Sequence, residues 1–493
     1  MSIVRGLLWS YVERWGNKII SLLVFIILAR LLDPKDFGLV ALAKLFIDYA
    51  DSVAGQGLGF AIIQRKEIND EHLNTAFWVN VFSSLALVLL IGLLAPIIAT
   101  MFSEPGVIDV LRALAVIVVI SSLSRVQVAI LTRAQQFNKL AVRGLIMAMV
   151  GGAVGIGFAA AGFGVWSLVY QQIATAVVAL ILLWGIAEWR PKFSFSMVAI
   201  KQLYGFASKV VLDQQILYFS RRLDEALIGA LLGATLLGYY SIAKRLFETL
   251  ADLVFSVLTK VLLAAFSKTQ DDIAALCATA EKVIASMAAV SFPLFLAAGA
   301  ASGELIQIVF GEKWLAASAP FSLLMVAALF LLTPTVLHPV FHAVGKPGIP
   351  LQTNVGRAVA SAVGVSIGSA LGIAGVAGGV LVRNAAGAWL DVRAFKQVMG
   401  RAYSAVLRPQ LAYATYCLPM VLTMIGLSLL LGSHLSAPTR LLVMSAAGFV
   451  AYAGMLAGFK AQALRDAGSI LINAIQYVKV RAGKLVGEKN DQA

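Results

Sequence analysis

The stretch Leu31–Lys44 reads LLDPKDFGLVALAK, and two hundred residues later Leu231–Lys244 reads LLGATLLGYYSIAK. An acid follows the last lysine of each copy by four residues, Asp48 in the first and Glu248 in the second. Each copy lies at a predicted tight turn between two long apolar segments. The chain is therefore predicted to consist of two equivalent halves. The identical pairs are Leu31/Leu231, Leu32/Leu232, Gly38/Gly238, Ala43/Ala243 and Lys44/Lys244.

The composition places these halves in a membrane. The chain is 60% hydrophobic and 13% charged, whereas soluble domains are about half apolar and about a quarter charged. Apolar runs of roughly 20 residues, enough to cross a bilayer as a helix, recur along the chain. The runs lack the period of two that marks a β-barrel, which excludes that class. The predicted fold is an all-α, polytopic helical membrane protein.

About fourteen transmembrane helices are predicted, and the lysines and arginines orient them. More than half of these residues fall in loops and tails on the side of the N-terminus, while the opposite loops hold Lys35, Lys313 and Arg440. The positive-inside rule then places both termini in the cytoplasm. This topology accounts for the net charge of +14, so no nucleic-acid partner is predicted. The spans are 8–32, 37–63, 75–100, 107–132, 142–162, 164–187, 205–232, 236–259, 283–303, 316–341, 351–371, 374–392, 409–431 and 440–459.

The spans group into two six-helix lobes and two extra helices. Residues 1–200 form the predicted N-lobe, 201–403 the C-lobe, and 404–459 the extra helices. Two lobes of equal orientation imply a pseudo-twofold axis along the membrane normal, as in transporters with a substrate path between parallel repeats. Residues 460–493 form a basic cytoplasmic tail, either an interfacial amphipathic helix or a solvated one.

Charged residues inside the predicted spans concentrate in the first two helices of each half. Such groups cost at least about 2.5–3.5 kcal/mol each at mid-bilayer, so they usually face a cavity or a partner. Four polar helices, two from each half, are predicted to enclose one hydrated cleft. Snorkelling at helix ends and structural ion pairs remain the alternative for any single residue. The charged set includes Arg14, Lys18, Lys44, Asp48, Asp213, Arg221, Arg222, Asp224, Lys244, Arg245 and Glu248.

The sequence contains no motif for an enzyme, a cofactor or a metal. A P-loop is missing, which excludes an ATP-driven pump in this chain. Cys277 and Cys417 are isolated, so no disulfide framework follows. His338 and His342 lack a third ligand at metal spacing, and a kinked helix end beside Pro339 is the better interpretation. We expect no catalytic residues, no metal and no cofactor.

Three segments resemble polysaccharide transporters of the multidrug/oligosaccharidyl-lipid/polysaccharide exporter superfamily, and more narrowly the Wzx-type flippases of the colanic-acid exporter branch. They are LARLLDPKDFGLVALAKLFIDYADSVAGQGLGFAIIQRK (Leu28–Lys66), GYYSIAKRLFETL (Gly238–Leu250) and VFGEKWLAASAPFSLL (Val309–Leu324). The resemblance covers about residues 1 to 460. It implies translocation of an undecaprenyl-diphosphate-linked oligosaccharide across the bacterial inner membrane, for exopolysaccharide, capsule or O-antigen synthesis, by rocking of two lobes about a central cavity.

The resemblance gives the charged residues expected roles. Arg and Lys are natural ligands of a diphosphate, and Arg245 after Ala243-Lys244 matches a cavity arginine of the peptidoglycan-precursor flippases. The implied partners are the lipid-linked oligosaccharide, membrane lipids, and a polysaccharide polymerase with its co-polymerase. Expected substrate-binding residues are Arg14, Lys18, Lys44, Arg221, Arg222, Lys244 and Arg245. Expected cavity acids, which neutralise the empty cavity or bind a coupling cation, are Asp48, Asp213, Asp224 and Glu248.

Two other function classes remain open from the sequence. A cation-coupled multidrug or metabolite antiporter of the same superfamily is expected to have a more apolar or acidic cavity than this basic one. A membrane polymerase or ligase is expected to have a large outside loop, which the predicted topology lacks. The sequence names neither the glycan nor the coupling ion.

Overall fold

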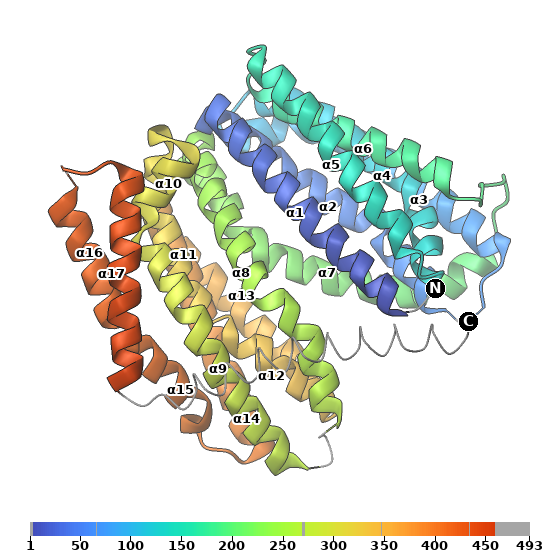
Figure 1. Ribbon diagram of the computed structural model, residues 1–493. Helices are drawn as coiled ribbons and strands as arrows, with labels where there is room; N and C mark the ends of the chain where they lie inside the picture. Colours follow the sequence, from blue (N-terminus) through green and yellow to red (C-terminus); the bar gives the residue numbers. More distant parts are fainter. Residues whose placement is uncertain (1–2, 66, 269–271, 347, 433, 459–493) are drawn as a thin grey trace, which may run out of the picture. The chain divides into compact units, whose positions relative to one another are not determined.

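The computed structural model describes residues 3–65, 67–268, 272–346, 348–432 and 434–458, and its regular structure there is entirely helical (Figure 1). The predicted tail from residue 460 lies outside the described residues. The helices are α1 (Ile3–Leu31), α2 (Pro34–Gln64), α3 (Asp70–Met101), α4 (Val107–Arg133), α5 (Phe137–Ala160), α6 (Val165–Ile186), α7 (Met197–Leu232), α8 (Ala234–Lys268), α9 (Ile273–Ala300), α10 (Ser302–Phe310), the short 3₁₀ turn η1 (Glu312–Ala317), α11 (Ser318–Leu329), α12 (Leu332–Ala343), α13 (Gly348–Ser369), α14 (Gly372–Met399), α15 (Tyr403–Tyr416), α16 (Leu418–Leu431) and α17 (Ala437–Gly458).

Each predicted span coincides with helix, but two of them are broken. The span 316–341 consists of α11 and α12, and the span 409–431 consists of α15 and α16 with a break at Cys417. Prolines explain both breaks, because Pro334 and Pro419 lie in the first turn of the second helix of each pair, where a missing N–H is harmless. The short elements α10 and η1 were not predicted.

Membrane-crossing character is uneven along the chain. Within the described residues, nine helical segments are long and apolar enough to cross a membrane by length and composition. The four helices that carry the clustered charges, α1, α2, α7 and α8, are not among these nine. The chain is thus a multi-pass membrane protein, and the count of fourteen spans stays a prediction.

Contacts group the chain into two units. Unit 1 comprises Met1–Ile242, Val309–Trp314 and Ser369–Ile373; unit 2 comprises Ala243–Ile308, Leu315–Gly368 and Ala374–Ala493. Unit 1 includes α7, which packs along α2. The lobe boundaries deduced from the repeat, 1–200 and 201–403, remain a prediction, because grouping by contact does not test symmetry.

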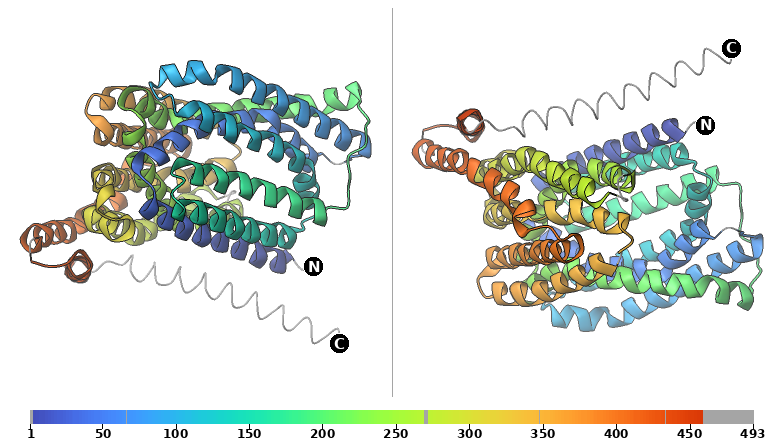
Figure 2. Two further views of the ribbon diagram at one scale, coloured as in Figure 1. Left: turned by 90° about the horizontal axis from the view of Figure 1, so that it is seen from above. Right: turned by 90° about the horizontal axis from the view of Figure 1, so that it is seen from below.

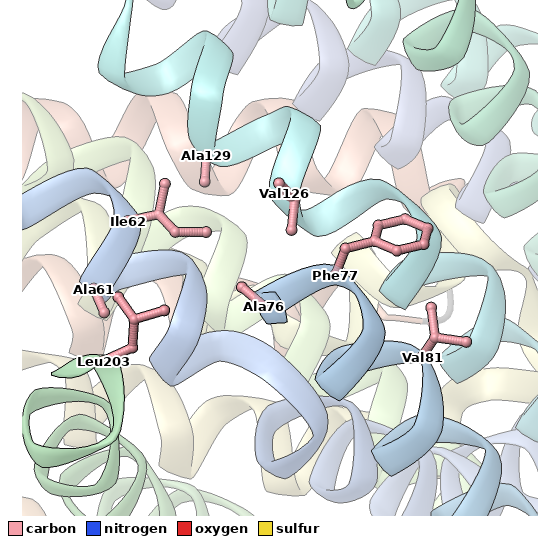
Figure 3. Packing of buried hydrophobic residues seen from close by; sticks show 8 residues of the cluster. All are labelled: Ala61, Ile62, Ala76, Phe77, Val81, Val126, Ala129 and Leu203. Carbon is pink, nitrogen blue, oxygen red and sulfur yellow. The ribbon is translucent and has the colours of Figure 1, made fainter. Parts of the chain in front are cut away.

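In unit 1 the helices α1 to α6 run side by side, as the views in Figure 2 show. One buried cluster joins four helices of this unit: Ala61 and Ile62 from α2, Phe77 and Val81 among others from α3, two residues of α4, and Leu203 of α7 (Figure 3). Small side chains at several of these positions let the helices approach closely, and such packing drives helix association in a lipid environment.

In unit 2, glycines hold α13 and α14 close together. A Cβ atom built on Gly368 would lie 2.1 Å from the carbonyl oxygen of Gly375, and one on Gly379 would lie 2.5 Å from that of Gly364. Gly364, Gly368, Gly375 and Gly379 thus let the two helices approach backbone to backbone. Helices α16 and α17 pack on each other and on α9. Arg440 Nε donates a hydrogen bond to Glu304 Oε1 at 2.7 Å and thereby ties α17 to α10.

Candidate functional site

The two copies of the repeat contact each other within unit 1. A Cβ atom on Gly38 would lie 1.8 Å from the carbonyl oxygen of Ala234, and one on Gly238 would lie 1.8 Å from the carbonyl oxygen of Pro34. Residues 34 and 234 are equivalent in the repeat, so the contact is reciprocal. The α1–α2 turn and the α7–α8 turn therefore touch backbone to backbone, and only glycine fits at either position.

Side chains from two other connections hold these turns. Trp314 Nε1 donates to the carbonyl of Ala29 at 2.7 Å, and Lys313 Nζ donates to the carbonyl of Leu32 at 2.6 Å. These bonds satisfy carbonyl groups that the end of α1 leaves without a partner in the helix. From the α3–α4 connection, Glu104 accepts a hydrogen bond from the backbone N–H of Ala234 at 3.4 Å and pairs with Lys35 at 3.4 Å. We call the turns 32–38, 102–104, 233–238 and 309–314 the turn cluster; the predicted topology places it on the outer side.

Further along α2 and α7, four charged side chains form one network. Lys44 Nζ lies 3.1 Å from Asp48 Oδ1, and a guanidinium nitrogen of Arg222 lies 3.5 Å from Asp48 Oδ2. Another guanidinium nitrogen of Arg222 lies 2.8 Å from both carboxylate oxygens of Glu225. The side chains of Lys44, Asp48 and Arg222 are 41%, 30% and 34% exposed, whereas that of Glu225 is 7% exposed. This charge network is neutral as it stands, and its cations are partly exposed.

Tyrosines fix the backbone around this network. Tyr218 on α7 donates a hydrogen bond to the carbonyl of Leu45 at 2.5 Å, one turn from Asp48. Tyr240 on α8 donates to Asp224 Oδ2 at 2.6 Å, and Asp224 is only 1% exposed. The structure thus places Asp224 in the packing between α7 and α8, while the Asp48 side chain is partly exposed.

The remaining predicted site residues are dispersed. Lys18 is half-buried on α1, and Arg221 is exposed on α7. On α8, in unit 2, Lys244 is 8% exposed while Arg245 and Glu248 are exposed. The side chains of Arg14 and Asp213 lie outside the described part of the structure. Of the predicted set, the structure brings together Lys44, Asp48 and Arg222.

Sequence reasoning missed Arg125 on α4. Its guanidinium lies 2.5 Å from Asp51 Oδ1 and also donates to the carbonyl of Asp51 at 2.7 Å. Gly55 on α2 makes room for it, because a Cβ there would lie 2.8 Å from Arg125 Cδ. An arginine deep within an apolar span was the available signal, and the spacing of Asp51 and Gly55 on one face of α2 was the second.

Sequence reasoning also missed a polar triad inside unit 2. Asp391 on α14 is fully buried, and its two carboxylate oxygens pair with Arg357 of α13 and with His338 Nε2 of α12, the latter at 3.1 Å. Gly387, one turn before Asp391, lets the Arg357 side chain cross α14, since a Cβ there would lie 2.0 Å from Arg357 Nε. His338 therefore has a carboxylate partner, in addition to its place beside Pro339.

We expect Asp391→Asn to lower the free energy of unfolding by about 3–5 kcal/mol, because it leaves the buried Arg357 without its counter-charge. Thermal unfolding of the purified full chain measures this loss. The matched control is Arg393→Met, an exposed residue two positions along the same helix. A double variant, Arg357→Met with Asp391→Leu, should regain much of the loss, and equal unfolding midpoints for Asp391→Asn and the parent would contradict the prediction.

Comparison with known proteins places the chain in a family. The family model described as polysaccharide biosynthesis protein matches residues 27–319. The succinoglycan biosynthesis transport protein ExoT of Rhizobium meliloti is 26% identical over 75% of this chain and 74% of its own length. The lipopolysaccharide biosynthesis protein WzxC of Escherichia coli is 25% identical over 74% and 77%. The teichuronic acid biosynthesis protein TuaB of Bacillus subtilis is 24% identical over 92% and 95%.

Solved structures share the fold. The lipid II flippase MurJ in an inward closed conformation matches with a TM-score of 0.71 and 14% identity, over 91% of this chain and 98% of that one. An inward-facing multidrug transporter of the MATE family matches with a TM-score of 0.57 and 16% identity, over 82% and 98%. The helical membrane fold predicted from the sequence is confirmed. Because the family model covers more than half of its length, the chain belongs to the polysaccharide biosynthesis protein family.

Proposed function

We propose that this protein flips an undecaprenyl-diphosphate-linked oligosaccharide from the inner to the outer leaflet of a bacterial inner membrane, with both termini in the cytoplasm. The observation that carries the proposal is the charge network, in which accessible cations lie on helices of a transporter fold. The family and the printed functions of its relatives in succinoglycan, lipopolysaccharide and teichuronic acid biosynthesis support this cargo. Membrane lipids, a polymerase and a co-polymerase are the proposed partners.

The cations are proposed to hold the diphosphate, and the acids to balance them when the cargo is absent. Asp48 already engages both Lys44 and Arg222, so an arriving diphosphate replaces one carboxylate with a stronger, multiply charged ligand. Arginine suits this role through bidentate contacts. The full proposed binding set is Arg14, Lys18, Lys44, Arg221, Arg222, Lys244 and Arg245, with Asp48, Asp213, Asp224 and Glu248 as balancing or ion-coupling acids.

Transport requires that the cargo binds the inward and outward states differently, because equal affinity for both states shifts no equilibrium. The turn cluster is proposed to be the part that opens toward the outside. Its backbone contacts at Gly38 and Gly238 are tight but few. No step of this cycle makes or breaks a covalent bond, which agrees with a transporter and not an enzyme.

Complementation of a strain that lacks the gene tests the binding residues. We expect Lys44→Ala and Arg245→Ala each to reduce polymer output about tenfold or more, since a hydrogen bond to a charged group contributes about 1.5–3 kcal/mol. Lys201→Ala is the matched control, because that exposed lysine lies on α7, the helix of Arg222, and outside both the turn cluster and the proposed binding set. Full polymer output from both single variants and from the double variant would overturn the proposed binding set.

A cation-coupled antiporter is the second candidate, and the MATE-type fold match favours it. The two candidates differ in what a knockout strain accumulates. A flippase knockout should trap intact lipid-linked repeat units on the cytoplasmic leaflet and lose the polymer. Normal lipid-linked glycans and normal polymer, together with altered drug susceptibility, would instead support the antiporter.

A further inference from the structure

Two adjoining hollows lie within unit 1, beside α6. The first, which we call the arginine hollow, has a volume of about 420 Å³ and is lined by Arg125, Arg143 and Ser124 with apolar neighbours. The second, the amide hollow, has a volume of about 410 Å³. The hollows share Ala176 and Ala179 of α6 in their walls, and we call the pair the groove. The polar residues of the amide hollow are Asn17, Ser21, Gln171, Gln172 and Thr175.

The arginine hollow is built around groups with hydrogen-bonding capacity to spare. Arg143 Nε donates to the carbonyl of Ala179 at 2.9 Å, which holds this side chain against α6. Arg125 is anchored by Asp51, and its Nε atom is buried with no hydrogen-bond partner among the described residues. Asn80 is fully buried, and both of its amide atoms likewise lack a partner there. Buried polar groups without partners are uncommon in native proteins, and each calls for a partner such as a water molecule or a ligand.

Asn80 is fully buried next to Gly55, one of the residues that line this hollow. A Cβ atom on Gly55 would lie 2.6 Å from Asn80 Oδ1 and 2.8 Å from Arg125 Cδ. Gly55 therefore leaves the space that brings both side chains together. Arg125 and Arg143 both line this hollow, and guanidinium groups are strong ligands of anionic groups.

The amide hollow has the opposite character, because its polar residues are all uncharged. Gln172 Nε2 donates to the carbonyl of Leu168 at 3.3 Å, which leaves its carbonyl oxygen as an acceptor. Gln171 packs on Gly155, where a Cβ would lie 2.8 Å from its own Cβ, so its place on α6 is fixed by close packing. Amides and hydroxyls together offer both donors and acceptors without charge, which matches the hydroxyl groups of a neutral sugar.

We propose that this groove is the saccharide site of the transporter: the amide hollow binds hydroxyl groups of the first sugars of the cargo, and the arginine hollow binds an anionic group attached to them. The anionic group is a phosphate or a sugar carboxylate, which share the same chemistry toward arginine. The inference rests on the proposed flippase function and adds to it a site separate from the charge network. Each hollow exceeds the roughly 300 Å³ at which ligand pockets begin.

Binding measurements on the full chain in lipid nanodiscs test the amide hollow with two probes. One is undecaprenyl diphosphate without sugar, and the other is the pool of lipid-linked saccharides extracted from a strain that lacks this protein. We expect the variant Gln171→Met/Gln172→Met to bind the saccharide lipids about tenfold more weakly and the sugar-free lipid unchanged, since two lost hydrogen bonds are worth about 1.4 kcal/mol or more. Gln64→Met, an exposed glutamine at the end of α2, is the matched control.

Arg143→Gln distinguishes the two anions. Weaker binding of both probes assigns the arginine hollow to phosphate, and weaker binding of the saccharide lipids alone assigns it to a sugar carboxylate. If the double glutamine variant unfolds, the single variant Gln172→Ala takes its place, and unfolding midpoints verify each fold.

Three results distinguish a failure of the proposed saccharide site from a failure of the proposed flippase function. Unchanged affinities in all groove variants would overturn the saccharide site. Equal affinity of the parent protein for both probes would also overturn the saccharide site, but it would leave the proposed flippase function intact. A parent protein that binds neither probe would overturn both.

Discussion

Gly38→Ala should lower polymer output by at least about fivefold without lowering the amount of protein in the membrane. The new Cβ atom would lie 1.8 Å from the carbonyl oxygen of Ala234, so the two turns have to separate. Overpacking of this kind costs about 1–3 kcal/mol, which shifts an equilibrium between closed and open turns by about 5- to 150-fold. Polymer output in a complemented knockout strain measures the effect.

The reciprocity of the contact makes this prediction sharper. Gly238→Ala meets the carbonyl oxygen of Pro34 at the same 1.8 Å and should give nearly the same loss. Gly92→Ala is the matched control, because that glycine lies inside α3 with no atom within 4 Å of a built Cβ. Wild-type output from both Gly38→Ala and Gly238→Ala would show that the turn cluster does not need to close as the structure has it.

This pair of glycines also shows what the sequence reveals and what it does not. The repeat identified Gly38 and Gly238 as equivalent, and the turns it predicted are present. The sequence did not reveal that the two copies touch, because identical residues in two halves specify symmetry and not distance. Only the backbone positions show that each glycine packs on the turn that holds the other.

The contacts of the charged residues likewise divide into those that the sequence predicts and those that it does not. Spacing predicted that Lys44 and Asp48 share a helix face, and they form an ion pair. The partners that lie far apart in the sequence, such as Arg222 for Asp48 or Arg357 for Asp391, were not predictable from spacing. Helix periodicity reports neighbours three or four residues apart, whereas contacts between helices depend on how each helix is rotated against the next.

Burial separates residues that the sequence treats alike. Asp48 and Asp224 are both acids in charged spans, yet Asp48 is 30% exposed at its side chain and Asp224 is 1% exposed and bonded to Tyr240. The sequence pattern gives the depth of a residue in the membrane only coarsely. It does not identify the residue that the side chain contacts. Asp48 is the more exposed of the two acids in the charge network, and it contacts both of the cations there. It is therefore the position at which the proposed mechanism is best tested.

Asp48→Asn should bind undecaprenyl diphosphate about tenfold more tightly than the parent protein and yet export polymer about tenfold more slowly. The network of Lys44, Asp48, Arg222 and Glu225 is neutral, so this change leaves one net positive charge facing the diphosphate. One additional favourable ion pair at a partly exposed site readily exceeds the 1.4 kcal/mol that corresponds to tenfold. Tighter binding that is uniform through the cycle does not speed transport, and it slows release.

Binding of undecaprenyl diphosphate to the full chain in nanodiscs measures the predicted gain in affinity. Polymer output in cells measures the predicted loss of export. Asp109→Asn, an exposed acid in the first turn of α4, is the matched control. Adding Lys44→Gln to Asp48→Asn restores neutrality, and the tenfold gain in affinity should then disappear, because the gain comes from net charge and not from the asparagine. If Asp48→Asn weakened binding instead, Asp48 would have to organise the cations for the cargo, and its role as a balancing acid that the diphosphate displaces would be wrong.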